Sequence, residues 1–192
     1  MKYVRQLREH FRNAPAFTIN DVKVFLRSKG ISSGYVHLLL HNLAAKGEIG
    51  KISRGTYTFS DDAQTVGFAF RPFYYGLQEA LSIRNLWEQE TNPVVITPRS
   101  VRSGVRTFQG GNFLVKRISR RMFFGFELLK YGNFWIPVSD VEKTLIDFAY
   151  FRQPLSRETA QEMGKKLRMK VLRAYLRRCP VWVGKKVLES IE

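Results

Sequence analysis

The chain has 192 residues, of which 44% are hydrophobic and 25% are charged, a balance typical of one or two globular domains. Lys and Arg outnumber Asp and Glu by 32 to 16, and the net charge of +16 predicts a polyanionic partner, either nucleic acid or an anionic membrane surface. No apolar run approaches the roughly 20 residues of a membrane span, and Cys179 is the only cysteine. We therefore exclude an integral membrane protein, a disulfide scaffold and a multi-cysteine zinc finger.

The positive charge is concentrated at the two ends of the sequence. Residues 1–60 and residues 151–192 each carry a net charge of +7, whereas residues 61–150 carry +2. Within this middle part, residues 99–121 hold seven positive side chains and no acidic one. The N-terminus lacks the apolar stretch of a signal peptide, and a lone thiol suits a reducing compartment, so we expect a cytoplasmic protein.

The sequence before position 30 predicts two helices. Val4, Leu7 and Phe11 recur at helical spacing, and the proline that follows ends the first helix because it has no N–H group. Thr18 and Asp21 have the spacing of a helix start, in which each side chain bonds the backbone of the other residue. The glycine after this second helix is the expected left-handed residue at its end.

A third helix and a β-hairpin complete the first sixty residues. Ser32 is expected to cap the helix, which runs to Lys46 and ends at the following glycine. Residues 56–59 alternate polar and apolar side chains as a half-buried strand does, and Arg54 with the next glycine supplies the turn. Three helices followed by a hairpin are the ground plan of a winged helix-turn-helix domain, which we assign to residues 1–60.

The third helix has two distinct faces. On a helical wheel, Val36, Leu39, Leu40 and Leu43 face the core, and Leu38 lies on the opposite side. An exposed leucine is unusual against water, but in the major groove it can contact a thymine methyl group. The helix and the hairpin together give the predicted DNA-contacting residues, which are Ser32, Ser33, Tyr35, His37, Leu38, His41, Asn42, Lys51 and Arg54.

The rest of the chain predicts a second, α+β domain over residues 72–192, with a linker at residues 61–71. A helix is expected over about 73–87 and another from a Ser139–Glu142 capping box to about Phe151. The C-terminal forty residues look helical, with an interruption at Pro180. The strand-like runs are Val94–Ile96, Phe113–Val115, Phe123–Leu129 and Phe134–Ile136. The predicted fold class is therefore α+β, a winged helix-turn-helix followed by a small, mainly antiparallel sheet and a helical C-terminus.

Two further groups of basic residues could form a second surface for nucleic acid or a protein partner. The middle group is Arg99, Arg102, Arg106, Lys116, Arg117, Arg120 and Arg121. The C-terminal group is Lys166, Lys170, Arg173 and Arg177, which align on one stripe of a predicted amphipathic helix. Such a stripe can bind DNA phosphates, an acidic protein or a membrane surface, and it is equally well explained as a solvated helix face.

The sequence gives no reason to predict an enzyme, a cofactor or a metal site. The two histidines of the third helix are four residues apart, but the pattern His-Leu-Leu-Leu-His lacks the glutamate of a zinc-protease helix. Asp140, Glu142 and Asp147 could form a metal-dependent nuclease site. A helix cap, and an i,i+4 pair of Lys143 with Asp147, explain these residues better.

The order of several motifs resembles the AbiEi family, the antitoxins of abortive-infection (type IV) toxin–antitoxin systems. The resemblance covers about residues 17–151. It lies in the run from Thr18–Val22 to Arg54–Tyr57 and in residues 75–81 of the next predicted helix. It is clearest in residues 138–147, which look like the family's Glu-Lys/Arg-Thr-Leu-Leu-Asp helix start. The chain is shorter than the family pattern after this last helix.

The resemblance implies an autoregulatory antitoxin. Its N-terminal domain would bind inverted repeats in its own promoter and repress the operon. Its C-terminal domain would neutralise a nucleotidyltransferase-like toxin without forming a stable complex with it.

The predicted function is a sequence-specific DNA-binding transcriptional regulator, acting as a monomer or a homodimer, with no membrane partner. One alternative is an RNA-binding protein that uses residues 99–121, with Phe108, Phe113, Phe123 and Phe124 stacking on bases. A second alternative is a metal-dependent nuclease built on the three carboxylates named above.

Overall fold

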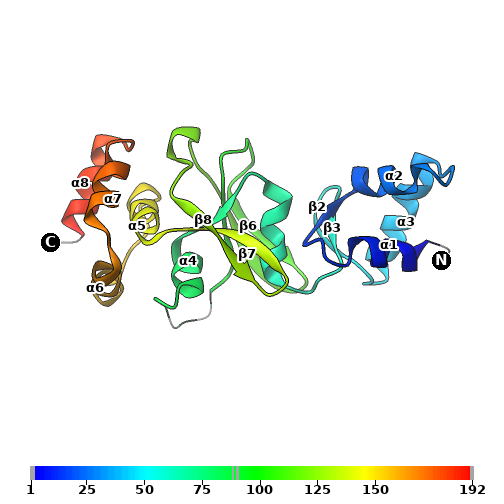
Figure 1. The fold of residues 1–192 in the computed structure, drawn as a ribbon, viewed down its shortest axis with the longest axis horizontal. Helices are drawn as coiled ribbons and strands as arrows, with labels where there is room; N and C mark the ends of the chain where they lie inside the picture. Colours follow the sequence, from blue (N-terminus) through cyan, green and yellow to red (C-terminus); the bar gives the residue numbers. More distant parts are fainter. Residues whose placement is uncertain (1–2, 88, 90, 191–192) are drawn as a thin grey trace.

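The computed structural model describes residues 3–87, 89 and 91–190. The fold is α+β, with a small antiparallel sheet, a larger mixed sheet and helices at the C-terminus. Figure 1 shows these parts following one another along the longest axis, with the two ends of the chain at opposite ends of the molecule. One hydrophobic core lies in the N-terminal part, and two others lie around the large sheet.

The N-terminal part contains the three predicted helices and the predicted hairpin. Thr18 and Asp21 form the reciprocal capping bonds, and Ser32 accepts a hydrogen bond from the backbone N–H of Tyr35. Gly47 follows the third helix with a φ of +69°, which favours glycine. The elements are α1 (Val4–Phe11), β1 (Phe17–Thr18), α2 (Ile19–Arg27), α3 (Ser33–Ala45), β2 (Gly50–Ser53) and β3 (Thr56–Thr58).

The small sheet has one strand that the sequence did not predict. Its order is β1-β3-β2, all antiparallel, and Phe17 of β1 lies opposite Tyr57 of β3. Two residues are too few to show the polar–apolar alternation of a strand. The pairing of β1 also depends on a partner strand about forty residues away in the sequence.

The large sheet has six strands in the order β6-β7-β5-β4-β9-β8. The pairs β5–β7 and β4–β9 are parallel, and the other pairs are antiparallel. The sheet is therefore larger than predicted and mixed, where we expected a small and mainly antiparallel one. Its strands are β4 (Tyr74–Tyr75), β5 (Val94–Thr97), β6 (Gly104–Phe108), β7 (Gly111–Arg117), β8 (Phe126–Tyr131) and β9 (Phe134–Ser139).

The helix predicted over 73–87 is wrong at both ends. Tyr74 and Tyr75 form a central strand that pairs with β5 and β9, and both side chains are fully buried. The helix α4 covers only Leu77–Ile83, and it follows Gly76, whose added Cβ would lie 2.4 Å from Ile96. Both tyrosines are buried, so the short run carries no polar–apolar alternation from which a strand could be read.

The segment 61–71, expected as a linker, contains η1 (Ala63–Phe70), a 3₁₀ helix. Val66 and Phe70 are buried in one core of the large sheet, and Ile52 of the β2–β3 hairpin belongs to the same core. The connection is therefore packed rather than open. The division into a DNA-binding unit and an effector unit stays a prediction.

The chain ends in four helices around one end of the large sheet (Figure 1). The N-cap of the first is Asp140, whose side chain accepts a hydrogen bond from the backbone N–H of Lys143, so the predicted Ser139–Glu142 capping box is wrong. Ser139 instead bonds Thr144 within the core. No helix within the described residues has the length and apolar character needed to cross a membrane. The helices are α5 (Val141–Tyr150), α6 (Arg157–Lys166), α7 (Met169–Leu176) and α8 (Val181–Glu189).

Candidate nucleic-acid interface

The helix α3 exposes the face that the helical wheel predicts. Leu38 is 57% exposed and Tyr35 is 37% exposed, and both histidines of the helix are exposed as well. The leucine and valine side chains on the opposite face, Val36, Leu39, Leu40 and Leu43, are buried. The predicted register of this helix is therefore confirmed.

The exposed face of α3 combines polar side chains with an apolar one, and it carries no carboxylate. Ser32 and Ser33 are exposed at its N-terminus, and Asn42 is half-buried at its flank. The ring of Tyr35 meets that of Tyr3 edge to face at 6.2 Å. The ammonium group of Lys29 lies 5.6 Å from the same Tyr3 ring, so the first turn of α3 has a positive charge beside it.

The β2–β3 hairpin is held between the N-terminal core and the large sheet. Lys51 and Arg54 are exposed, as predicted for DNA-contacting residues, but Ile52 between them is only 5% exposed. A Cβ added at Gly50 would lie 2.8 Å from the ring of Phe108 on β6. The hairpin therefore has a fixed position against the second part of the chain.

The seven basic residues of the middle group do not form one continuous surface. Arg106 lies over the ring of Phe70, 4.9 Å from its centroid, on one face of the large sheet. Lys116 lies over Phe151 at 5.0 Å on the other face, where burial lowers the pKa of its ammonium group. Arg106 of β6 lies opposite Phe113 of β7, and Lys116 follows Phe113 by three residues, so the alternation along β7 places the two basic side chains on opposite faces. The remaining members, Arg99, Arg102, Arg117, Arg120 and Arg121, are exposed.

The aromatic residues of the RNA alternative are packed inside the protein. Phe108, Phe113 and Phe124 are buried, and Phe123 packs against Tyr74 and Phe126. Phe108, Phe113 and Phe124 are therefore unavailable for stacking on bases, and the expectation that they stack is wrong for these three rings.

The predicted C-terminal stripe is divided between two helices. Lys166 is the last residue of α6, whereas Lys170 and Arg173 belong to α7 and Arg177 is its C-cap. Arg168, between the two helices, has an extended backbone that interrupts the helical register. All four side chains of the stripe are exposed. The interruption predicted at Pro180 is confirmed, since this residue is the N-cap of α8.

A buried ion pair lies inside α5. The Lys143 ammonium group bonds the Asp147 carboxylate, and neither side chain is exposed to solvent. The hydroxyl of Tyr74 donates a second hydrogen bond to Asp147 at 3.0 Å. The Lys143 ammonium group also lies 5.2 Å from the ring centroid of Phe124. The predicted i,i+4 pair is confirmed, but it belongs to the core and not to the surface.

The other two carboxylates of the nuclease alternative also have protein partners. Arg168 donates to Glu142 through Nε at 3.1 Å and through Nη2 at 3.0 Å. Asp140 accepts a hydrogen bond from the hydroxyl of Tyr175 at 2.8 Å. Within the described residues, no three His, Cys, Asp or Glu side chains are grouped so as to hold a metal ion. The three acids therefore act as helix cap and core partners in this structure.

The link between Arg168 and Glu142 predicts a pH-dependent contribution to stability. Burial acts to raise the pKa of Glu142, but the hydrogen bonds from Arg168 outweigh it and the net pKa is lowered. A carboxyl group with a lowered pKa in the folded state stabilises the fold above its unfolded pKa of about 4.3, and this contribution is lost as the pH falls through the folded value.

We expect Arg168→Ala to lower the free energy of unfolding by about 1–3 kcal/mol near neutral pH, because it leaves a buried carboxylate short of partners. The difference from the wild type should shrink at acidic pH, where Glu142 is protonated in both proteins. Urea unfolding at several pH values measures it, with Lys170→Ala as the exposed control. A difference that stays constant with pH would contradict this role.

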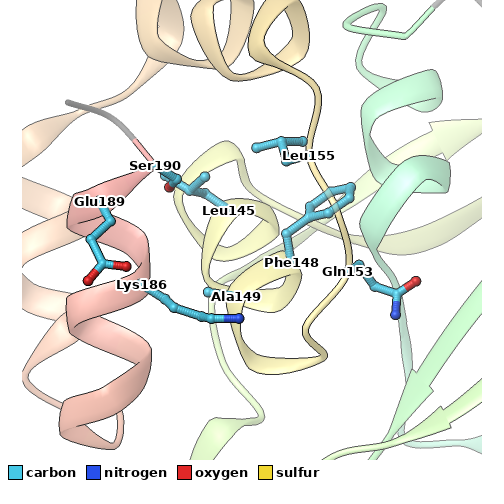
Figure 2. A pocket seen from close by; sticks show the side chains of 8 residues that line it. All are labelled: Leu145, Phe148, Ala149, Gln153, Leu155, Lys186, Glu189 and Ser190. Carbon is cyan, nitrogen blue, oxygen red and sulfur yellow. The ribbon is translucent and has the colours of Figure 1, made fainter.

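A cavity near the C-terminal end of the described chain is lined by both apolar and charged side chains. Its volume is about 270 Å³, it lies between α5 and α8, and Leu145, Phe148 and Leu155 form its apolar side. Figure 2 shows Lys186 extending from α8 toward Ala149 on α5. Glu189 of α8 also lines this cavity. The exposed face of α3 is the candidate site on which the proposed function rests.

Comparisons of this chain with protein-family models and with curated proteins give no match. The likeness to the AbiEi family therefore rests on the sequence motifs alone.

Proposed function

We propose that the protein binds duplex DNA sequence-specifically, with the exposed face of α3 in the major groove, and acts as a transcriptional regulator. One observation carries the proposal. A helix without acidic residues presents an exposed leucine, Leu38, between the two exposed histidines His37 and His41. A single α-helix fits the major groove, where a leucine can contact a thymine methyl group and imidazoles can bond base edges.

The charges around α3 support a DNA ligand. Residues 1–60 carry a net charge of +7. Of their three acidic residues, Glu9 is paired with Arg5, and Asp21 is engaged in the α2 capping box. Phosphate contacts supply most of the sequence-independent affinity for DNA, so an uncompensated excess of this size favours binding.

The order of the elements supports a winged helix-turn-helix for this unit. The sequence α1-β1-α2-α3-β2-β3 places α3 after a short turn from α2 and places a hairpin after it. In this arrangement α3 is the recognition helix and the hairpin is the wing.

We further propose that the regulator acts on its own operon as an antitoxin, with a nucleotidyltransferase-like toxin as its functional partner. Residues 138–147 carry the resemblance that supports this role. Lys143 and Asp147 of this motif are buried, so its charged residues stabilise α5 and do not contact a partner directly.

The proposal predicts different effects for helix and hairpin. His41→Ala should change the preference among duplex sequences, because the side chain lies where bases are read. Arg54→Ala should weaken binding to all duplexes alike and make the slope of log affinity against log salt shallower by about one, as expected for one phosphate contact.

The measurement is fluorescence anisotropy with the full chain, using a duplex from its own upstream region, a scrambled duplex and an RNA competitor. Arg157→Ala, an exposed arginine on α6, serves as the control. Equal and sequence-independent losses from His41→Ala and Arg54→Ala would show that α3 reads no bases.

A further inference from the structure

A groove of about 470 Å³ lies where the N-terminal unit meets the large sheet. It is bounded by the N-terminus of α2, the tip of the β2–β3 hairpin and the end of η1. Figure 1 shows the hairpin next to the large sheet at this junction. Three arginines from three different elements line the groove: Arg54 at the hairpin tip, Arg71 after η1 and Arg99 after β5.

The two arginines from the second part of the chain are held in place. The guanidinium group of Arg71 lies over the ring of Phe68, 4.6 Å from its centroid. Nη1 of Arg99 donates a hydrogen bond to the carbonyl of Ala69 at 3.1 Å. Each guanidinium group has five N–H donors, so both retain donors for a ligand.

The charged residues that line the groove are three arginines and one aspartate, a net charge of +2. In the part of the chain that the structure describes, none of the three arginines forms an ion pair with a carboxylate. One acidic residue, Asp21, also lines the groove, but its Oδ2 already accepts hydrogen bonds from the backbone N–H and the hydroxyl of Thr18. An anion that enters the groove would be attracted by this net positive charge.

We propose that this groove binds phosphates of the DNA backbone, so that the DNA contacts continue from the N-terminal unit onto Arg71 and Arg99. The inference rests on the proposed function and extends it to residues outside the first sixty. Guanidinium groups bind phosphate oxygens through paired N–H donors, and backbone contacts fix the register of a protein on the duplex. The groove therefore positions α3 and reads no sequence itself.

The test compares Arg71→Gln and Arg99→Gln with the wild type in the full chain, by anisotropy titrations at several salt concentrations. Glutamine removes the charge but keeps two carbons of the side-chain stem and an amide donor, and circular dichroism checks that each variant is folded. Each variant should make the salt slope shallower by about one. The advantage of the wild type over each variant should therefore shrink about 3.5-fold between 50 and 200 mM salt, equally for the upstream and the scrambled duplex. Arg157→Gln is the control and should leave the slope unchanged.

Two results would overturn the assignment. One is an unchanged salt slope in both folded variants. The other concerns a variant that carries both Arg71→Gln and Arg99→Gln. If inorganic phosphate at constant ionic strength stabilises the wild type but not this double variant, and DNA binding is the same in both, the groove binds a free anion instead. Failure of the proposed function itself gives a different result. If the wild-type protein binds no duplex more tightly than it binds RNA, specific DNA binding is refuted before any variant is compared.

Discussion

Replacing Lys143 by Met is expected to lower the free energy of unfolding by about 3–5 kcal/mol, the range found when one partner of a buried ion pair is removed. The variant leaves the Asp147 carboxylate without its counter-charge in a position that is fully shielded from water. Among the described residues, the side-chain donor that remains for this carboxylate is the hydroxyl of Tyr74. All three tryptophans lie beyond residue 80, so tryptophan fluorescence during urea unfolding reports on this part of the chain.

The double variant Lys143→Met with Asp147→Asn separates loss of the charge pair from loss of packing. Asparagine still accepts the hydrogen bond from Tyr74 but carries no charge, so the double variant should recover most of the lost stability. Lys170→Met, on an exposed position of α7, should change stability little. Equal losses in the single and the double variant would show that the pair itself is not what stabilises α5.

Replacing Leu38 by Glu is expected to reduce the affinity for the upstream duplex by at least about a hundredfold, because a carboxylate facing the groove costs several kcal/mol through repulsion and lost apolar contact. The side chain is already 57% exposed, so the fold should be retained. Electrophoretic mobility shift measures the loss, and circular dichroism with a thermal melt checks the fold.

The matched control is Leu188→Glu, which changes an exposed leucine on α8 in the same way. Figure 1 places α8 at the opposite end of the molecule from α3, so this variant should bind the duplex as the wild type does. Similar losses in both variants would show that the effect comes from net charge and not from α3. Unchanged binding by Leu38→Glu would remove α3 from the interface.

The N-terminal elements could be predicted because their signals are local. Thr18, Asp21 and Ser32 make capping bonds within three residues along the chain, and the apolar side chains of α3 recur at helical spacing. The sequence did not predict the strands β1, β4 and β6. Two of them, β1 and β4, have only two residues each. Their existence depends on pairing with distant partners, such as Tyr74 with Ile96.

The exposed face of α3 could be predicted for the same local reason, whereas the basic groups could not be assembled correctly. Arg106 and Lys116 lie on the neighbouring strands β6 and β7 and point to opposite faces of the sheet, which follows from the pairing register of these strands. The break between α6 and α7 coincides with the bonds that Glu142 accepts from the backbone and side chain of Arg168, 26 residues away. A helical wheel contains no information about such a contact.

The β2–β3 hairpin belongs to two cores at once, since Ile52 packs with the large sheet while Tyr57 packs with the N-terminal helices. The ring of Phe108 lies so close to Gly50 that a side chain at this position would collide with it. A ligand that moved this ring would therefore shift the hairpin relative to α3. Binding at the sheet and binding at the helix would then share a coupling free energy, and such coupling is reciprocal. Under the proposed DNA-binding function, a partner that weakens DNA binding through this contact would itself bind less tightly to the DNA-bound protein.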